Sequence, residues 1–141
     1  MDENTVAELK ERLNKNNSDI EAAISLGNIY FDTGDAGQAI LYYRLALDAN
    51  PDLPGVLTDM GTMYWRNNDI NLAEQAFREA IVKDSSFGNA YVNLGQLLYR
   101  AKNDVTEARS VWQQLLTVNP GHAAVAKARE LLWETATPAN N

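Results

Sequence analysis

Aromatic side chains and arginines recur in this sequence at one fixed interval. Phe31, Trp65 and Tyr99 are spaced 34 residues apart, and Arg66 and Arg100 share that interval. Aromatic rings supply a large contact area at low entropic cost, and guanidinium groups match carboxylates with paired hydrogen bonds. These side chains indicate recognition of another molecule, such as a peptide, rather than a chemical reaction.

Catalytic and metal-binding chemistry has few candidates. His122 is the only histidine, and no partner stands at a spacing that a metal or a catalytic base requires, so we expect it to be a solvated turn residue. The acidic residues are spread over expected helix caps and outer faces. The absence of cysteine excludes disulfides, thiolate zinc sites and cysteine nucleophiles. The sequence therefore predicts no enzyme, no metal site and no cofactor.

Composition narrows the class of partner. A length of 141 residues with 45% hydrophobic and 22% charged residues suits one globular domain. The net charge of −7 opposes binding to nucleic acid and to anionic membranes, which attract clustered Lys and Arg. No apolar run reaches the roughly 20 residues that span a bilayer, and the start, MDENTVAELKERL, lacks a signal-peptide core. We expect a soluble chain, cytoplasmic or periplasmic, or a soluble piece of a membrane-anchored protein.

The interval of 34 residues also governs the expected architecture. Leu26-Gly27, Met60-Gly61 and Leu94-Gly95 repeat with it. A fixed period of this length is typical of stacked helical units that bury their apolar faces against one another. We predict a single domain over residues 1–141 with three helix pairs, the third carrying one extra residue in its turn. The pairs are placed at residues 20–53, 54–87 and 88–122.

Local signals place the helix ends and the closest helix contacts. Ser18 and Glu21 are expected to cap the first helix of the first pair, and Gly34 to end it in a left-handed conformation. Asp35, Asp69 and Asp104 are expected caps of the second helices. Gly27, Gly61 and Gly95 lie in the middle of expected helices, where glycine lowers helix stability by about 1 kcal/mol relative to alanine. We therefore expect each of these glycines to make room for an aromatic ring from the partner helix. The predicted contacts are Gly27/Tyr43, Gly61/Phe77 and Gly95/Trp112.

Both ends of the chain are predicted to cover the array. Residues 1–19 contain a helix whose Val6, Leu9 and Leu13 have the spacing of a second helix of a unit, which makes a half repeat. Residues 123–135 form a closing helix. Residues 136–141 are expected to be a mobile tail. The inward positions of the closing helix are Val125, Ala128, Leu131 and Leu132.

The full pattern resembles the tetratricopeptide repeat. Each unit has Leu-Gly-x-x-Tyr or a close variant, followed by an alanine nine residues later, or ten in the third unit because of its extra residue. An aromatic residue and a second small or apolar residue follow at the next turns, and two units end in proline. The tryptophan that often opens the motif is replaced by Ala23, Leu57 and Tyr91. The resemblance implies an all-α, right-handed superhelical solenoid of three repeats with an N-terminal half-repeat helix and a C-terminal capping helix. It also implies a protein-interaction scaffold.

The same resemblance implies a binding groove on the first helix of each unit. The alternative for its aromatic residues is packing on the neighbouring helix. Family members that grip an acidic C-terminal peptide use lysine, asparagine, asparagine, lysine and arginine at five groove positions. The residues at these positions here are Ile24, Asn28, Asp59, Asn89 and Asn93. Only Asn28 fits, so such a peptide should bind poorly. The expected partner-binding residues are Ile24, Asn28, Phe31, Thr58, Thr62, Trp65, Arg66, Val92, Gln96, Tyr99 and Arg100.

The partner itself is not encoded in this pattern. The leading expectation is a protein or peptide partner. Residues 107–132 are similar to the closing part of bacterial membrane-anchored repeat proteins such as those assisting cytochrome c maturation, which suggests an assembly factor. The alternative is self-association of the array into a homo-oligomer, and an enzyme is the third and weakest class.

Overall fold

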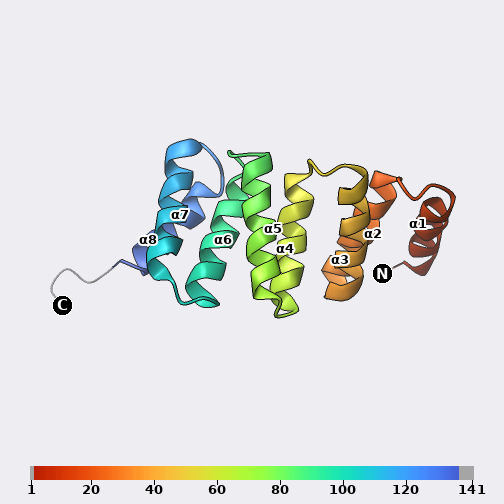
Figure 1. Cartoon of the computed structure of the whole chain (residues 1–141), viewed down its shortest axis with the longest axis horizontal. Helices are drawn as coiled ribbons and strands as arrows, with labels where there is room; N and C mark the ends of the chain where they lie inside the picture. Colours follow the sequence, from red (N-terminus) through yellow and green to blue (C-terminus); the bar gives the residue numbers. More distant parts are fainter. Residues whose placement is uncertain (1, 137–141) are drawn as a thin grey trace.

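The computed structural model describes residues 2–136, which form eight α-helices without a β-strand. The helices follow one another along a single axis in chain order (Figure 1). The predicted all-α repeat fold is thereby confirmed, while the predicted tail lies almost wholly outside the described residues. The helices are α1 (Glu3–Lys15), α2 (Ile20–Thr33), α3 (Ala36–Ala49), α4 (Pro54–Arg66), α5 (Ile70–Lys83), α6 (Gly88–Arg100), α7 (Val105–Val118) and α8 (Val125–Glu134).

The start of α2 corrects one prediction. The cap is Asp19 rather than Ser18, because the Asp19 carboxylate directly precedes the helix and accepts a hydrogen bond from Ala22 N at 3.0 Å. Arg12 of α1 lies 3.0 Å from the same carboxylate and also 3.3 Å from Glu21. Glu21 therefore pairs with α1 instead of closing a capping box. Gly34 ends α2 at φ 80°, as predicted.

The second helices begin at the predicted aspartates, with one difference in bonding. Asp35 and Asp104 accept backbone hydrogen bonds at 3.2 and 3.0 Å. Asp69 makes no such cap bond and instead accepts from Asn67 Nδ2 at 2.8 Å. The longer turn before α7 brings Lys102 Nζ to 2.5 Å from Glu74 on α5. The extra residue of the third unit therefore ties that turn to the preceding unit.

Glycine allows the two helices of each unit to meet closely. A Cβ atom added to Gly27 would lie 2.4 Å from the Tyr43 ring, and one added to Gly61 would lie 2.6 Å from Phe77. At Gly95 the distance to Trp112 would be 2.0 Å. The three rings are fully buried, so the surrounding side chains leave no space into which the rings could shift. All three predicted contacts are confirmed.

The array curves with its first helices on the inside. Within the described chain α2 contacts α4, α4 contacts α6 and α6 contacts α8, whereas α3, α5 and α7 make no contact with one another. Helices that touch lie closer together than helices that do not. The faces of α2, α4 and α6 that look away from their partner helices therefore form the concave side, which we call the inner face.

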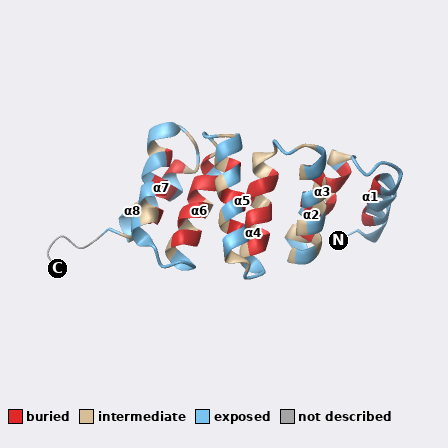
Figure 2. Ribbon diagram, in the orientation of Figure 1, coloured by how far each residue is buried: buried red, intermediate tan, exposed pale blue. Residues whose placement is uncertain are grey.

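Two apolar clusters make up the interior, and the end helices close them. The larger cluster runs from Ala39 on α3 to Leu131 on α8, and α8 contributes the buried residues predicted for it except Leu132, which is half-buried. The smaller cluster joins the predicted inward residues of α1 to α2 and to Ala46. Figure 2 shows burial concentrated on the middle helices and confined to one side of α1. The residues that α1 contributes are Val6, Leu9 and Leu13.

Removing either end helix should destabilise the array. Deletion of residues 1–16 would expose Ala23 and Leu26, which are now buried, and the loss should be on the order of a few kcal/mol for the apolar side chains involved. Deletion of 123–141 would uncover α7 in the same way. Thermal unfolding by circular dichroism and light scattering would measure both. Truncated forms that stay monomeric and melt with the intact chain would show that neither helix is a cap.

Candidate functional site

The predicted groove residues lie on α2, α4 and α6, but they differ in how much surface they offer. The rings of Phe31, Trp65 and Tyr99 are half-buried. Thr58 and Val92 are almost fully buried, at 4% and 6% exposure, and so offer little surface to a ligand. Ile24, Thr62 and Gln96 are half-buried, and the exposed members are Asn28, Arg66 and Arg100.

The aromatic side chains are held in different ways. The Arg66 guanidinium of α4 lies over the Phe31 ring of α2 at 5.2 Å, a cation–π contact between consecutive units. Tyr99 packs edge-on against Trp112 at 6.4 Å and 74°. Tyr99 is therefore partly a packing residue, as the alternative interpretation of these rings anticipated. Trp65 packs on the larger apolar cluster and remains partly exposed.

A group of polar side chains gathers between α2 and α4, and we call it the acidic end of the groove: Asn28, Asp32, Tyr43 and Asp59. The Tyr43 hydroxyl donates a hydrogen bond to Asn28 Oδ1 at 2.6 Å. Burial, together with the charges of Asp59 and Asp32, raises the pKa of that hydroxyl. Burial and the Asp32 charge likewise raise the pKa of Asp59. The negative charges of Asp32 and Asp59 therefore both act on the buried Tyr43 hydroxyl.

Within residues 2–136, neither carboxylate of this end has a Lys or Arg nitrogen within 4.0 Å. The convergence was not visible in the sequence. From the sequence, Tyr43 was predicted only to contact Gly27. Asp59 was considered only as a residue that disfavours acidic peptides. Tyr43 and Asp59 are 16 positions apart, which matches no helical or loop ligand spacing, so the feature depends on the packing of three helices.

Asp59→Asn should stabilise the chain at neutral pH. A carboxyl group whose pKa is raised by folding costs nothing below the unfolded value of 3.8. It lowers stability progressively as the pH rises through its folded pKa, because the ionised form is the one that burial and Asp32 disfavour. The melting temperature of the variant should exceed that of wild type at pH 7, and the difference should vanish below about pH 3.8.

Asp48→Asn supplies the matched control for that measurement, since Asp48 is exposed on α3, away from the inner face. It should change the melting temperature little at either pH. A variant at Asp59 that melts earlier than wild type at neutral pH would show that its carboxylate is held by interactions stronger than the repulsion described above.

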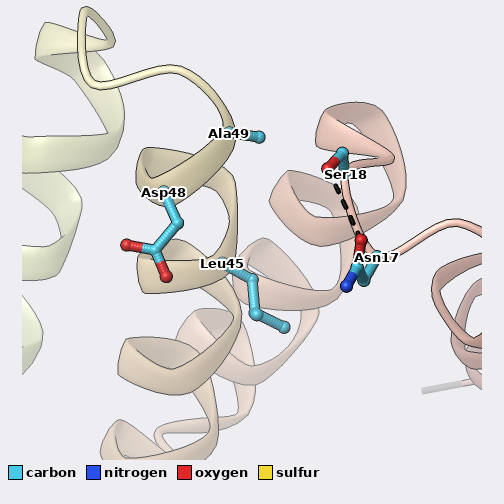
Figure 3. A pocket seen from close by; sticks show the side chains of 5 residues that line it. All are labelled: Asn17, Ser18, Leu45, Asp48 and Ala49. Atoms are coloured by element: carbon cyan, nitrogen blue, oxygen red, sulfur yellow. Dashed lines mark hydrogen bonds between the residues drawn. The ribbon is translucent and has the colours of Figure 1, made fainter.

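Three cavities lie away from the groove. Their volumes are about 180, 200 and 300 Å³, and none is lined by any of the predicted partner-binding residues. The first lies between the α1–α2 loop and the last turn of α3 (Figure 3). There Ser18 Oγ donates to Asn17 Oδ1 at 3.5 Å, and Asp48 is the one ionisable group of the lining. It offers no set of converging groups for catalysis.

His122 corrects a second prediction. It is half-buried rather than solvated, and its Nδ1 accepts a hydrogen bond from Ala124 N at 2.9 Å. The ring packs on Gly88, where a Cβ atom would come within 2.5 Å of it. His122 thus shapes the turn that leads into α8. No group of three or more metal-ligating side chains occurs in residues 2–136, and no helix there is long and apolar enough to cross a bilayer.

Two sequence models of the tetratricopeptide repeat match this chain, one over residues 20–53 and one over 58–120. Among curated proteins, human RNA polymerase II-associated protein 3 is 28% identical over 96 residues, and the rat protein is 30% identical over 94. These matches cover 68% and 67% of this chain but 14% of each relative. The chain therefore corresponds to about one-seventh of the length of these relatives.

Solved structures share the fold over most of the chain. MamA superposes with a TM-score of 0.75 at 19% identity, covering 92% of this chain and 79% of MamA. The first repeat domain of Spaghetti, bound to the HSP90 peptide SRMEEVD, gives 0.65 at 25% identity and covers 97% and 98%. The second repeat domain of human RPAP3, in complex with the HSP70 peptide SGPTIEEVD, gives 0.68 at 21% identity and covers 79% and 90%.

Proposed function

We propose that this chain, which belongs to the tetratricopeptide repeat family, is a protein-interaction scaffold that holds a peptide segment of its partner along the inner face of α2, α4 and α6. The observation that carries this proposal is the row of partly exposed aromatic rings on that face. Phe31, Trp65 and Tyr99 recur once per unit, beside exposed Asn28, Arg66 and Arg100. Aromatic rings that pack on the core and remain partly exposed suit the burial of apolar side chains of a ligand.

The inner face disfavours a peptide with an acidic C-terminus. Two related domains are solved with the HSP90 and HSP70 peptides named above, which end in Glu-Glu-Val-Asp. In this chain the acidic end of the groove would repel such a peptide, and Ile24, Asn89 and Asn93 supply no compensating positive charge. We therefore propose a partner segment of different chemistry, with any acidic residues placed toward Arg66 and Arg100.

Cross-linking of captured partners tests this proposal. The intact chain would be used to capture proteins from the source organism, and cross-linked peptides would be mapped by mass spectrometry. Cross-links should fall on α2, α4 and α6. Cross-links confined to α3, α5 and α7 would place the binding surface on the outer face and refute the proposal.

Self-association is a second candidate, favoured by Trp133. This side chain is 83% exposed on α8, at the end of the array where a further unit would stack. Light scattering after size exclusion, on wild type and Trp133→Ser, distinguishes the two candidates: an oligomer that the substitution dissolves would support assembly through α8. Membership of a bacterial membrane-associated assembly pathway, suggested by residues 107–132, is a further proposal that the identity of the captured partner would test.

A further inference from the structure

On the outer face of the array, the second helices of consecutive units stand apart. Within the described chain α3 and α5 make no contact with each other, although both pack on α4. A cavity of about 200 Å³ lies at this gap, and we call it the outer cavity. Its lining includes buried Met60 and Tyr64 of α4, exposed Arg44 of α3 and exposed Leu72 of α5. None of the residues expected to bind a partner along the inner face takes part in it.

The next gap along the outer face shows how the chain treats the equivalent arginine. Arg78 follows Arg44 by 34 positions, one unit later. Two carboxylates hold the Arg78 guanidinium: Glu74 on the same helix at 2.8 Å and Glu107 on α7 at 2.6 Å. The ion pair with Glu107 crosses the gap between α5 and α7. The fold therefore supplies this arginine with its own counter-ions.

Both of these carboxylates are missing around Arg44. Ile40 stands at the position of Glu74. Leu72 stands at the position of Glu107, 35 residues earlier because of the extra residue in the third unit. Within residues 2–136, no carboxylate oxygen lies within 4.0 Å of the Arg44 guanidinium, and Leu72 is 45% exposed. The outer cavity thus combines a cation that has no counter-ion with apolar surface open to solvent.

Hydrogen-bond donors meet in the outer cavity. The Arg44 guanidinium donates to the Tyr64 hydroxyl, which leaves the hydroxyl hydrogen and the other guanidinium N–H groups to donate to a ligand. Tyr64 is only 6% exposed, so the packing of its ring fixes the position of its hydroxyl. A guanidinium fork beside a hydroxyl matches the oxygens of a carboxylate.

One acidic residue of the lining restricts where such a carboxylate can lie. Glu79 follows Leu72 by seven residues on α5, about 10 Å along the helix axis. By equivalence with the Arg78–Glu107 pair, Arg44 stands opposite Leu72. Because like charges repel, a ligand carboxylate is favoured at the Leu72 end of the cavity, away from Glu79. An apolar residue next to the carboxylate can then pack on Leu72.

We propose that the outer cavity is a second binding site, which takes an aspartate or glutamate side chain of a partner protein together with an adjacent apolar residue. The acidic side chain accepts hydrogen bonds from Arg44 and Tyr64. It thereby takes the part that Glu107 plays for Arg78. Charge complementarity commits the site to an acidic segment, and its place on the outer face makes it independent of binding along the inner face.

A differential selection of peptides tests this inference. Short random peptides displayed on phage would be panned against the intact chain and depleted on its Arg44→Gln variant. The enriched peptides should contain Asp or Glu next to an apolar residue. Their Kd should rise at least about tenfold on Arg44→Gln, and by a similar factor on wild type when the acidic residue is replaced by its amide. The two changes together should cost little more than either alone.

Leu72→Glu tests the same site from within the chain. This substitution copies Glu107, so the new carboxylate should pair with Arg44 and take the place of the ligand. Binding of the enriched peptides should weaken at least about tenfold. Leu72→Gln removes the same apolar surface without adding a charge and should weaken binding less. Equal binding by Leu72→Glu and wild type would contradict the proposed position of the acidic side chain.

Controls distinguish the outer cavity from other sites. Arg129→Gln makes the same change of charge at an exposed position of α8 and should leave the Kd unchanged. Arg44→Gln should melt with wild type by circular dichroism, whereas early melting would show that Arg44 only holds Tyr64 in place and would overturn the inference. A selection that enriches no peptide, or only peptides without an acidic residue, would overturn it as well.

Trp65→Ala separates this inference from the proposed function. Peptides in the outer cavity should bind Trp65→Ala as they bind wild type. Peptides that Trp65→Ala weakens and Arg44→Gln does not would support the inner face and overturn the second site. Light scattering on the same proteins tests the other occupant: a wild-type oligomer that Arg44→Gln dissolves would place a second copy of this chain in the outer cavity and overturn the inference.

Discussion

Replacing Gly61 with leucine should lower the free energy of unfolding by about 1–3 kcal/mol or more. A Cβ atom alone would lie 2.6 Å from the Phe77 ring, and the leucine adds three further carbons. Phe77 is fully buried in the larger apolar cluster, so α4 and α5 must move apart to accept the new side chain. Urea unfolding followed by circular dichroism would measure the loss.

Gly37→Leu is the matched control for this change. Gly37 is an exposed residue in the first turn of α3, and the nearest atom to an added Cβ is Asp35 Oδ1 at 3.9 Å. The free energy of unfolding of Gly37→Leu should therefore stay within about 1 kcal/mol of the wild-type value. Because leucine makes the unfolded chain less flexible than glycine does, part of the effect stabilises the variant. Equal stability of the two variants would contradict the helix contact at Gly61.

Trp65→Ala should weaken binding of the partner by roughly 2 kcal/mol or more, which corresponds to about a 30-fold rise in Kd. The Trp65 ring is anchored on the larger apolar cluster and partly open on the inner face, the position at which a ligand side chain can be enclosed. Titration of the captured partner, with wild type and variant side by side, would measure the change.

Circular dichroism supplies the folding control for that titration. A Trp65→Ala variant that melts well below wild type would identify Trp65 as a packing residue. A variant that binds the partner normally would show that the binding site lies elsewhere.

Arg66→Ala/Arg100→Ala should remove a salt-sensitive part of the affinity if the partner carries carboxylates. The Arg66 contact with Phe31 at 5.2 Å implies that this double change also frees the Phe31 ring.

The fold was predictable because the residues that specify it lie close together in the sequence and recur. Each glycine and its aromatic partner are separated by 16 or 17 residues within one helix pair, and the period repeats the pair. Asp19 was missed as a cap because Ser18 and Glu21 present a competing pattern one residue away. His122 was taken for a solvated residue because Gly88, which makes room for its ring, lies 34 positions earlier, at the start of α6.

The site was predictable only in outline. Resemblance placed the inner face on the first helices, and the structure puts the expected residues there, but their roles as partner-binding residues stay predictions. Sequence alone could not separate Thr58, which donates to Pro54 O at 2.8 Å and is nearly buried, from the open Asn28. Nor could it reveal that the Tyr43 hydroxyl donates to Asn28 Oδ1 at 2.6 Å, since this depends on how α2 and α3 pack.

The contact pattern of the helices has a consequence for the way this chain folds. Every helix touches only its immediate neighbours in the chain or the helix two places away, so no contact joins the two ends of the described residues. Folding then requires no closure of a long loop, which favours a fast search and allows structure to begin in any unit and spread to the next. The smaller apolar cluster around α1 is the segment that should open first when the array frays.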